Sequence, residues 1–124
     1  MRTEVFSSPS LGLTIFREED GLLSWTGAYK GAVLKKILAL GEGDGYILLL
    51  DRDARDVKMQ PHFKNLIGIA EDGTLRWIAE LPRSPDVFVE ARMELGGLSA
   101  WTWSGYKIQI DPISGKVLHE EFVK

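Results

Sequence analysis

The stretch WTWSGYKIQIDPISGKVLH, residues 101–119, indicates the fold of this chain. Apolar and polar residues alternate from Tyr106 to Ile110, which is the period of a half-buried β-strand. The residues DPISG at 111–115 are typical of a tight turn, because Gly accepts positive φ and Asp or Ser side chains bond to the turning backbone. A second apolar run follows, so the stretch predicts two antiparallel strands joined by a turn.

The same pattern recurs along the whole chain, where short apolar runs are separated by turn residues. We therefore predict an all-β protein, an antiparallel meander of about eight or nine strands. A chain of 124 residues fits one domain, so residues 1–124 are expected to share a single core. The predicted turns are EEDG (18–21), GEGDG (41–45), EDG (71–73), GG (96–97), SG (104–105) and DPISG (111–115).

Four segments between these turns have distinct patterns. GYILLLD (45–51) is apolar on both faces, which predicts a central strand covered on both sides. GAVLKKILAL (31–40) has apolar residues at helical spacing, but we predict a strand because a Gly-rich turn leads to the next segment, as in a hairpin. In 87–94 the alternation predicts one face formed by Val, Val, Ala and Met. The segment from about 52 to 64 lacks alternation and contains Pro61, so it is predicted to be a polar insertion.

Three segments resemble one another when they are aligned on a turn glycine: LTIFREEDGLLSW (13–25), LIGIAEDGTLRW (66–77) and KIQIDPISGKVLH (107–119). The first two carry Trp four residues after the glycine, and His119 takes this place in the third. The glycines are separated by 73 − 21 = 52 and 115 − 73 = 42 residues. The second spacing matches a four-stranded propeller blade of about 40–45 residues, and the first is longer by about the size of the polar insertion.

These residues resemble the β-propeller repeat of the pyrroloquinoline-quinone-type proteins, whose blades end in Asp-x-x-Thr-Gly with Trp four residues later. The third segment supplies Asp111, Ser114 and Gly115 but has His119 in place of Trp, and the first two lack the Asp. The resemblance covers roughly residues 13–122 and implies two blade-like repeats, with the Trp docking one blade on the next. A closed ring needs at least about four blades, so no quinone site is carried over. The resemblance implies instead two sheets that pack on each other or self-associate.

Trp101 and Trp103 share one face of a predicted strand from Leu98 to Ser104, because side chains alternate along a strand. One interpretation places both in the core between the sheets, together with Trp25 and Trp77. The alternative is an exposed aromatic patch, formed by Trp101, Trp103 and Tyr106, that binds a partner.

Composition argues against several classes of protein. The net charge is −3, with Lys and Arg scattered among acids, so we predict no nucleic-acid partner. The absence of Cys excludes disulfides and thiolate chemistry. The N-terminus has no apolar core of a signal peptide, and the run from Tyr46 to Leu50 is far shorter than the about 20 residues of a membrane helix. The chain is therefore predicted to be cytoplasmic, without membrane contact.

Few residues suggest catalytic or metal chemistry. The acids Asp51, Asp53 and Asp56 are interleaved with Arg and lack the Gly and Glu of a calcium loop, which favours a solvated loop. His62 and His119 are the only histidines, and their spacing does not indicate a metal site. We therefore predict no catalytic residues, no metal and no cofactor.

Two functions are compatible with these patterns. The first is a non-enzymatic β-sheet interaction module that acts through protein-protein contact. We expect this module to form a homodimer, with its contact at residues 98–104 or on the flanking strands. The alternative is a small ligand-binding domain or enzyme that uses the loop at 51–64, since long polar loops on rigid sheets often carry function.

Overall fold

The computed structural model describes residues 2–28, 32–41, 43–51, 64–82, 86–94 and 97–123. This part of the chain contains eleven strands and no helix, which confirms the all-β antiparallel prediction, although the strand number is higher than predicted. The strands are β1 (Thr3–Ser8), β2 (Leu13–Arg17), β3 (Leu23–Gly27), β4 (Leu34–Ala39), β5 (Tyr46–Leu50), β6 (Leu66–Ile69), β7 (Leu75–Ile78), β8 (Phe88–Glu94), β9 (Gly97–Thr102), β10 (Tyr106–Ile110) and β11 (Val117–Phe122).

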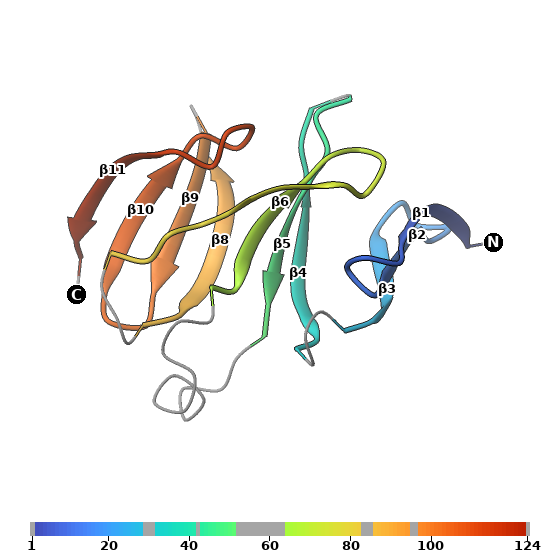
Figure 1. Ribbon diagram of the computed structural model, residues 1–124, viewed down its shortest axis with the longest axis horizontal. Helices are drawn as coiled ribbons and strands as arrows, with labels where there is room; N and C mark the ends of the chain where they lie inside the picture. The colour runs from blue at the N-terminus through green and yellow to red at the C-terminus, as the bar shows by residue number, and fades with distance from the viewer. Residues whose placement is uncertain are drawn as a thin grey trace.

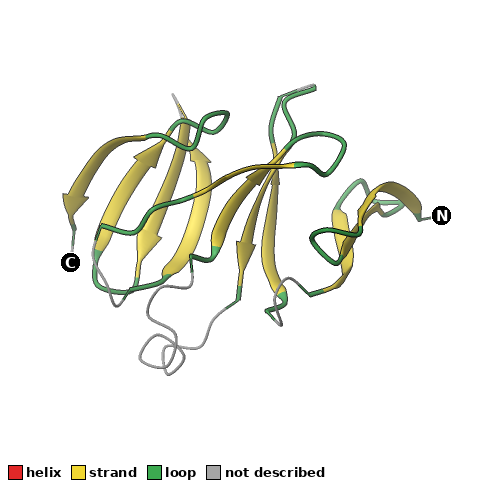
Figure 2. Cartoon of the chain, viewed as in Figure 1, coloured by secondary structure: helices red, strands yellow, loops and turns green. Residues whose placement is uncertain are grey.

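The strands form three antiparallel meanders. Sheet 1 has the order β1-β2-β3, sheet 2 the order β4-β5-β6-β7, and sheet 3 the order β8-β9-β10-β11. The three sheets follow one another along the long axis of the molecule, like blades (Figure 1), and loops connect them (Figure 2). Two blade-like repeats were predicted over roughly residues 13–122, and the described residues form three sheets, one of three strands and two of four.

Sheet 2 lies between the other two sheets, and β5 shows this most clearly. Tyr46, Leu48 and Leu50 belong to the core cluster shared with sheet 1, whereas Ile47 and Leu49 belong to the cluster shared with sheet 3. All five residues are buried. The prediction that this strand is covered on both sides is therefore confirmed.

The segment with helical spacing is strand β4, as predicted. Leu34 and Ile37 contact the sheet 1 cluster, while Leu38 contacts the sheet 3 cluster. The register against β5 shifts between Leu34 and Lys36. Because β4 has packing partners on both faces and an irregularity near its start, its apolar residues do not follow a simple alternation.

Strand β8 departs from the predicted alternation. Its register against β9 shifts between Phe88 and Glu90, as in a β-bulge. As a result Phe88 and Ala91 both join the core shared with sheet 2, although the alternation predicted opposite faces for them. Met93 shares the face of Ala91, as predicted, since it pairs with the core residue Leu98, but its side chain is exposed.

In each sheet, the turn that leads into the final strand has the same geometry. Gly21, Gly73 and Gly115 have φ values of 86°, 91° and 77°, in the left-handed region that favours glycine. Each glycine lies two residues before the final strand of its sheet. In each turn, the side chain of the residue before the glycine accepts a hydrogen bond from the backbone nitrogen of the residue after the glycine. The donors and acceptors are Leu22 and Asp20 (3.0 Å), Thr74 and Asp72 (2.9 Å), and Lys116 and Ser114 (3.2 Å). The predicted similarity of the three segments is therefore visible in their geometry.

Trp77 docks sheet 2 onto sheet 3. Its indole Nε1 donates a hydrogen bond to the Pro112 carbonyl at 3.0 Å, and the side chain is buried. A Cβ atom at Gly115 would lie 2.4 Å from Trp77 Cγ, and one at Gly68 would lie 2.2 Å from Trp77 Cε2. The ring therefore fills a space that exists only because both neighbours are glycines.

The junction between sheets 1 and 2 is built differently. A Cβ atom at Gly73 would lie 2.8 Å from Phe6 Cδ2, and Ser8 Oγ donates a hydrogen bond to the Gly73 carbonyl at 3.2 Å. Phe6 thus packs against the turn of the following sheet, as Trp77 does at the other junction. Trp25 is only half-buried. The expectation that both tryptophans lie in the core between the sheets therefore holds for Trp77, whereas Trp25 packs against the core and stays partly exposed.

Candidate functional site

Trp101 lies on the face of sheet 3 that points away from sheet 2. The Arg92 guanidinium carbon lies 4.9 Å from the centroid of its ring, and Lys107 Nζ lies 5.4 Å from it. Its neighbours Ala100 and Thr102 are buried, with Ala100 in the core. The interpretation of Trp101 as a core residue is therefore wrong, because the smaller alternate residues of β9 face sheet 2.

Paired charges complete this outer face of sheet 3. Lys107 Nζ and Glu94 Oε1 form an ion pair at 3.2 Å. A hydrogen bond from Ser99 lowers the pKa of Glu94, with a further contribution from Lys107. The cations also attract the face of the Trp101 ring, so the aromatic surface here is partly covered by the protein's own side chains.

The opposite end of the molecule has an outer face of the same kind. On sheet 1, the Arg2 guanidinium carbon lies 4.4 Å from the centroid of the Phe16 ring, and Arg2 pairs with Glu18 at 3.1 Å. A hydrogen bond from the Ser24 hydroxyl lowers the pKa of Glu18, and Arg2 lowers it further. Each end sheet therefore presents an aromatic ring under a cation that is paired with glutamate, which resembles the polar outer face of a terminal repeat.

His119 takes in sheet 3 the place that Trp77 has in sheet 2. It is the third residue of β11, as Trp77 is the third residue of β7. His119 pairs with Gln109, whose neighbours Ile108 and Ile110 face the core, so both His119 and Gln109 point outward. The imidazole stands where Trp77 contacts the next sheet, and no described sheet follows sheet 3.

Aromatic residues gather at one end of sheet 3. Trp103 is 49% exposed in the turn between β9 and β10. The rings of Tyr106 and Phe122 meet edge to face, with centroids 5.5 Å apart. Val123 donates a backbone hydrogen bond to the Gly105 carbonyl at 2.8 Å, which holds the end of β11 beside that turn. We call Trp103, Tyr106, Phe122 and Val123 the aromatic corner.

Two of the three predicted patch residues thus lie at the same end of sheet 3. Trp103 and Tyr106 belong to the aromatic corner, whereas Trp101 lies on the outer face beneath Arg92 and Lys107. The sequence patterns did not lead us to include β11, all six residues of which are exposed. Its apolar side chains include Leu118 at 59% and Phe122 at 61% exposure. One signal for including β11 was available in the sequence. It is an apolar run after the last predicted turn, and the final strand of a meander pairs with a neighbouring strand on one side only.

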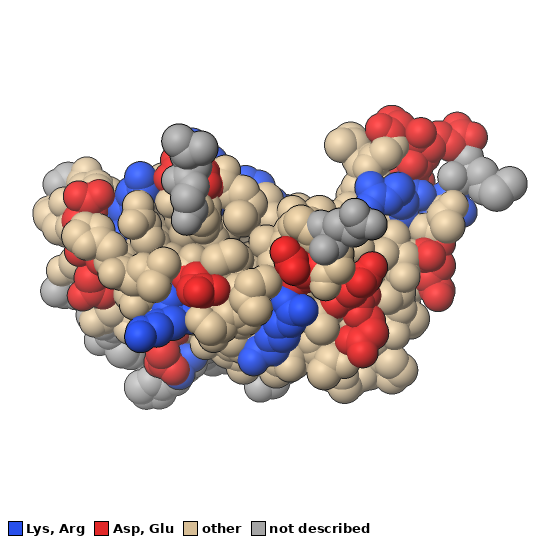
Figure 3. Space-filling view, turned by 90° about the horizontal axis from the view of Figure 1, so that it is seen from above, with Lys and Arg blue, Asp and Glu red and all other residues tan. Residues whose placement is uncertain are grey.

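The charges elsewhere on the surface are mixed. Figure 3 shows basic and acidic side chains interspersed over the face seen from above. Phosphate backbones are bound by surfaces on which basic side chains cluster. The face shown has no such cluster, so the absence of a nucleic-acid partner stays a prediction that this distribution supports.

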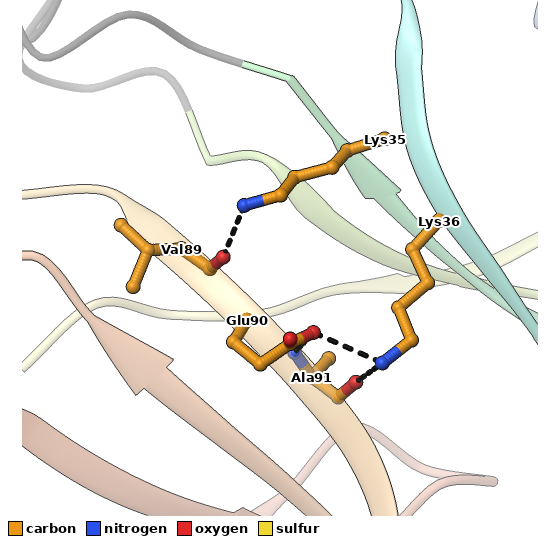
Figure 4. Close-up of polar contacts among 5 residues, drawn as sticks. All are labelled: Lys35, Lys36, Val89, Glu90 and Ala91. Carbon is orange, nitrogen blue, oxygen red and sulfur yellow. Dashed lines mark hydrogen bonds and ion pairs between the residues drawn. The ribbon is translucent and has the colours of Figure 1, made fainter.

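The edge of sheet 3 formed by β8 is closed by lysines from sheet 2 (Figure 4). Lys35 Nζ donates a hydrogen bond to the Val89 carbonyl at 2.6 Å, and Lys36 Nζ donates one to the Ala91 carbonyl at 2.7 Å. Lys36 also pairs with Glu90 at 3.0 Å. The bulge in β8 turns these carbonyls toward the lysines. The contacts join sheets 2 and 3 and occupy carbonyls to which another strand would bond.

The ionisation of the Glu90 carboxyl group makes the stability contributed by this contact depend on pH. Burial alone would raise the pKa of Glu90, but hydrogen bonds from Lys36 and the Ala91 nitrogen outweigh burial and lower the pKa below its usual value of 4.5. The folded protein therefore keeps this group ionised at pH values where the unfolded chain takes up a proton. The stabilisation is fully present above pH 4.5 and is lost as the pH falls through the folded pKa.

Replacing Glu90 with Gln should therefore reduce the loss of stability in acid. We expect Glu90→Gln to be less stable than the original chain at pH 7 and to show a shallower decline of unfolding free energy below pH 4.5. Urea unfolding at a series of pH values measures both quantities. Glu71→Gln, at an exposed glutamate, is the matched control. Parallel pH profiles for the original chain and Glu90→Gln would contradict the role assigned to this pair.

The described residues offer little for catalysis or metal binding. Asp51 is exposed, and the rest of the predicted loop at 52–63, including Asp53, Asp56 and His62, lies outside the described residues. Within the described ranges no group of three His, Cys, Asp or Glu could hold a metal ion, and no helix is long and apolar enough to cross a membrane. A shallow depression is lined by Ser7, Ser8, Ser10 and Thr74 together with the Asp72 carboxylate, which is hydrogen-bonded to Thr74.

Comparison with known proteins places most of the chain in a family. Residues 34–122 match the family model described as Domain of unknown function (DUF7957). This range begins at the first residue of β4 and ends at the last residue of β11, so it comprises the two four-stranded sheets. Curated proteins and solved structures gave no match to the chain. The resemblance to the quinone-type repeat stays a prediction.

Proposed function

Since the chain belongs to the DUF7957 family, we propose that it is a non-enzymatic β-sheet interaction module that binds another protein through the aromatic corner of sheet 3. The observation that carries this proposal is the exposure of apolar side chains on and beside one strand. Phe122 is 61% exposed, Leu118 59% and Val123 49%. Apolar surface of this kind is stabilised when a partner removes it from water.

The contrast with the two end faces supports this location. The aromatic rings of Trp101 and Phe16 each lie near a cation that is paired with glutamate. At the aromatic corner, Phe122 and Val123 are exposed apolar side chains, and the Phe122 ring meets that of Tyr106 edge to face. The exposed surface of Phe122 and Val123 is apolar, so a partner that removes it from water stabilises the complex.

A second copy of the chain is one candidate partner for such a surface, and the crosslinking experiment below distinguishes it from another protein. A two-fold axis would place the aromatic corner of one copy against the same corner of the other. We keep the homodimer as a proposal and move its contact from the outer face of residues 98–104 to the corner. The reason is that Arg92 and Lys107 already cover part of the Trp101 ring.

Site-specific photo-crosslinking tests the proposed function. The photoreactive analogue p-benzoylphenylalanine replaces Phe122 in one variant and Phe16 in the control, and both variants are expressed in cells that make the protein naturally. We expect a discrete protein crosslink from position 122 and none from position 16. A crosslinked product of twice the chain's mass identifies the homodimer, and sedimentation at micromolar concentration checks it. No crosslink from position 122, or equal crosslinks from both positions, would contradict the proposal.

A further inference from the structure

We infer that the outer edge of β11 binds an extended segment of a partner protein, with two adjacent Lys or Arg flanked by apolar residues, as an added strand of sheet 3. This inference rests on the proposed function and specifies the chemistry of the partner. It concerns the backbone edge and acidic side chains of β11 beside the aromatic corner.

The two edges of sheet 3 differ. The edge formed by β8 has its Val89 and Ala91 carbonyls bonded to Lys35 and Lys36. At the other edge, β11 pairs with β10 only, and none of the described residues bonds to its outer side. Figure 1 shows β11 at the end of the molecule farthest from the N-terminal sheet. An exposed edge with unpaired backbone groups accepts an additional strand by main-chain hydrogen bonds.

The side chains of β11 define the charge of that added strand. Glu120 pairs with the core-facing residue Ile108 and Glu121 pairs with Lys107, so the two carboxylates lie on opposite faces of the sheet. Among the described residues neither carboxylate forms an ion pair, because Lys107 is paired with Glu94. Opposite charges across neighbouring strands are favourable. A partner strand with a basic residue opposite each carboxylate would supply the missing charges.

The apolar requirement comes from the residues around this acidic pair. Leu118 precedes it, and Phe122 and Val123 follow it, all three well exposed. An added strand places side chains opposite those of β11 at the spacing of neighbouring strands. Apolar residues that flank the basic ones in the partner would therefore cover Leu118 and Phe122.

A second copy of β11 fits this edge less well. Residues paired across antiparallel strands share a face, so a two-fold axis between two copies of β11 must pass beside one residue and pair it with itself. An axis at Glu120 or Glu121 pairs that carboxylate with itself, and an axis at Leu118 places Lys116 opposite Glu120 but Gly115 opposite Glu121, so no axis gives both carboxylates a Lys or Arg partner. Like charges directly opposite each other are destabilising. The acidic pair therefore favours a basic strand from another protein over β11 itself.

Synthetic peptides test the inference on the full chain. The probe, called the Lys-Val peptide, is a capped peptide of about ten residues in which two adjacent Lys are flanked on both sides by Val, long enough to span β11. The first control peptide has Glu in place of Lys. The second keeps the Lys-Val sequence but carries N-methyl groups on every backbone nitrogen between the caps, which removes the hydrogen-bond donors of both edges of the peptide. Amide chemical shifts are followed by NMR during each titration.

We expect the Lys-Val peptide to bind with shifts centred on β11 and both control peptides to bind at least about tenfold more weakly. Glu120→Gln combined with Glu121→Gln should weaken binding of the Lys-Val peptide by about tenfold. The matched control, Glu4→Gln combined with Glu71→Gln, makes the same charge change on sheets 1 and 2 and should leave binding unchanged.

Absence of binding by the Lys-Val peptide, equal binding by the N-methylated peptide, or equal binding by the Glu-Val peptide would overturn the inference. These outcomes are separable from failure of the proposed function. A partner crosslinked from position 122 together with a negative peptide result leaves the interaction module standing and excludes strand addition by a basic segment. Absence of both the crosslink and peptide binding contradicts both proposals.

Discussion

Replacing Trp77 with Ala should lower the free energy of unfolding by about 3 to 5 kcal/mol. The ring is buried between Gly68 and Gly115, so neither neighbour has a side chain that could move into the space left behind. The substitution also removes the donor of the hydrogen bond to the Pro112 carbonyl. Both losses occur where sheet 2 meets sheet 3, so packing between the sheets is lost together with the side chain.

Urea unfolding followed by far-ultraviolet circular dichroism measures this loss. Trp25→Ala is the matched control, because Trp25 has the equivalent place in β3 but is only half-buried and sheet 1 docks through Phe6. We expect a loss of about 1 to 2 kcal/mol for the control, since less apolar area is removed from burial. A loss below about 1 kcal/mol for Trp77→Ala would show that the indole does not hold the two sheets together.

The strands and turns could be predicted because their signals are local. Gly21, Gly73 and Gly115 stand where the backbone needs positive φ, and the Asp or Ser before each one bonds to the turn. The apolar run of β5 required no knowledge of its neighbours to be identified as a strand with two covered faces. The position of each strand in its sheet could be predicted too, because consecutive strands of a meander pair with each other.

Alternation along a strand did not predict which of its two faces points toward the core. In β9 the alternation separates Trp101 from Ala100 and Thr102, but it does not say which set faces sheet 2. Size favoured the tryptophan as the core residue, and the structure places the small residues there instead. The bulge in β8 had no sequence signal either, and it reversed the expected relation between Phe88 and Ala91.

The candidate site was predictable in part for the same reason. Trp103 and Tyr106 were recognised because they are aromatic residues next to a predicted turn. Phe122 and Val123 join them only because β11 returns antiparallel to β10 and ends beside Gly105. Their exposure depends on sheet 3 being the last described sheet, a tertiary fact that no local pattern contains.

Asn65 should be the second most sensitive position. It is buried immediately before β6, and its amide nitrogen donates hydrogen bonds to the Leu50 carbonyl at 2.9 Å and the Phe88 carbonyl at 2.8 Å. Its side-chain oxygen accepts a hydrogen bond from the Phe88 nitrogen at 2.9 Å. One side chain therefore satisfies backbone groups of two different sheets.

We expect Asn65→Ala to lower the free energy of unfolding by about 3 to 5 kcal/mol, because three buried backbone groups lose their partner and each unsatisfied group costs about 1 to 3 kcal/mol before relaxation.

Asn65→Asp separates this cause from loss of packing, since Asp has nearly the same shape. Its ionised carboxylate would face the Leu50 and Phe88 carbonyls without a proton to donate, which raises the carboxyl pKa in the folded state. The folded variant then binds a proton more tightly than the unfolded chain, so Asn65→Asp should gain stability relative to the original chain as the pH falls through that raised pKa. Equal stability of Asn65→Asp and the original chain at neutral pH would show that the two donated hydrogen bonds contribute little to holding sheet 2 against sheet 3.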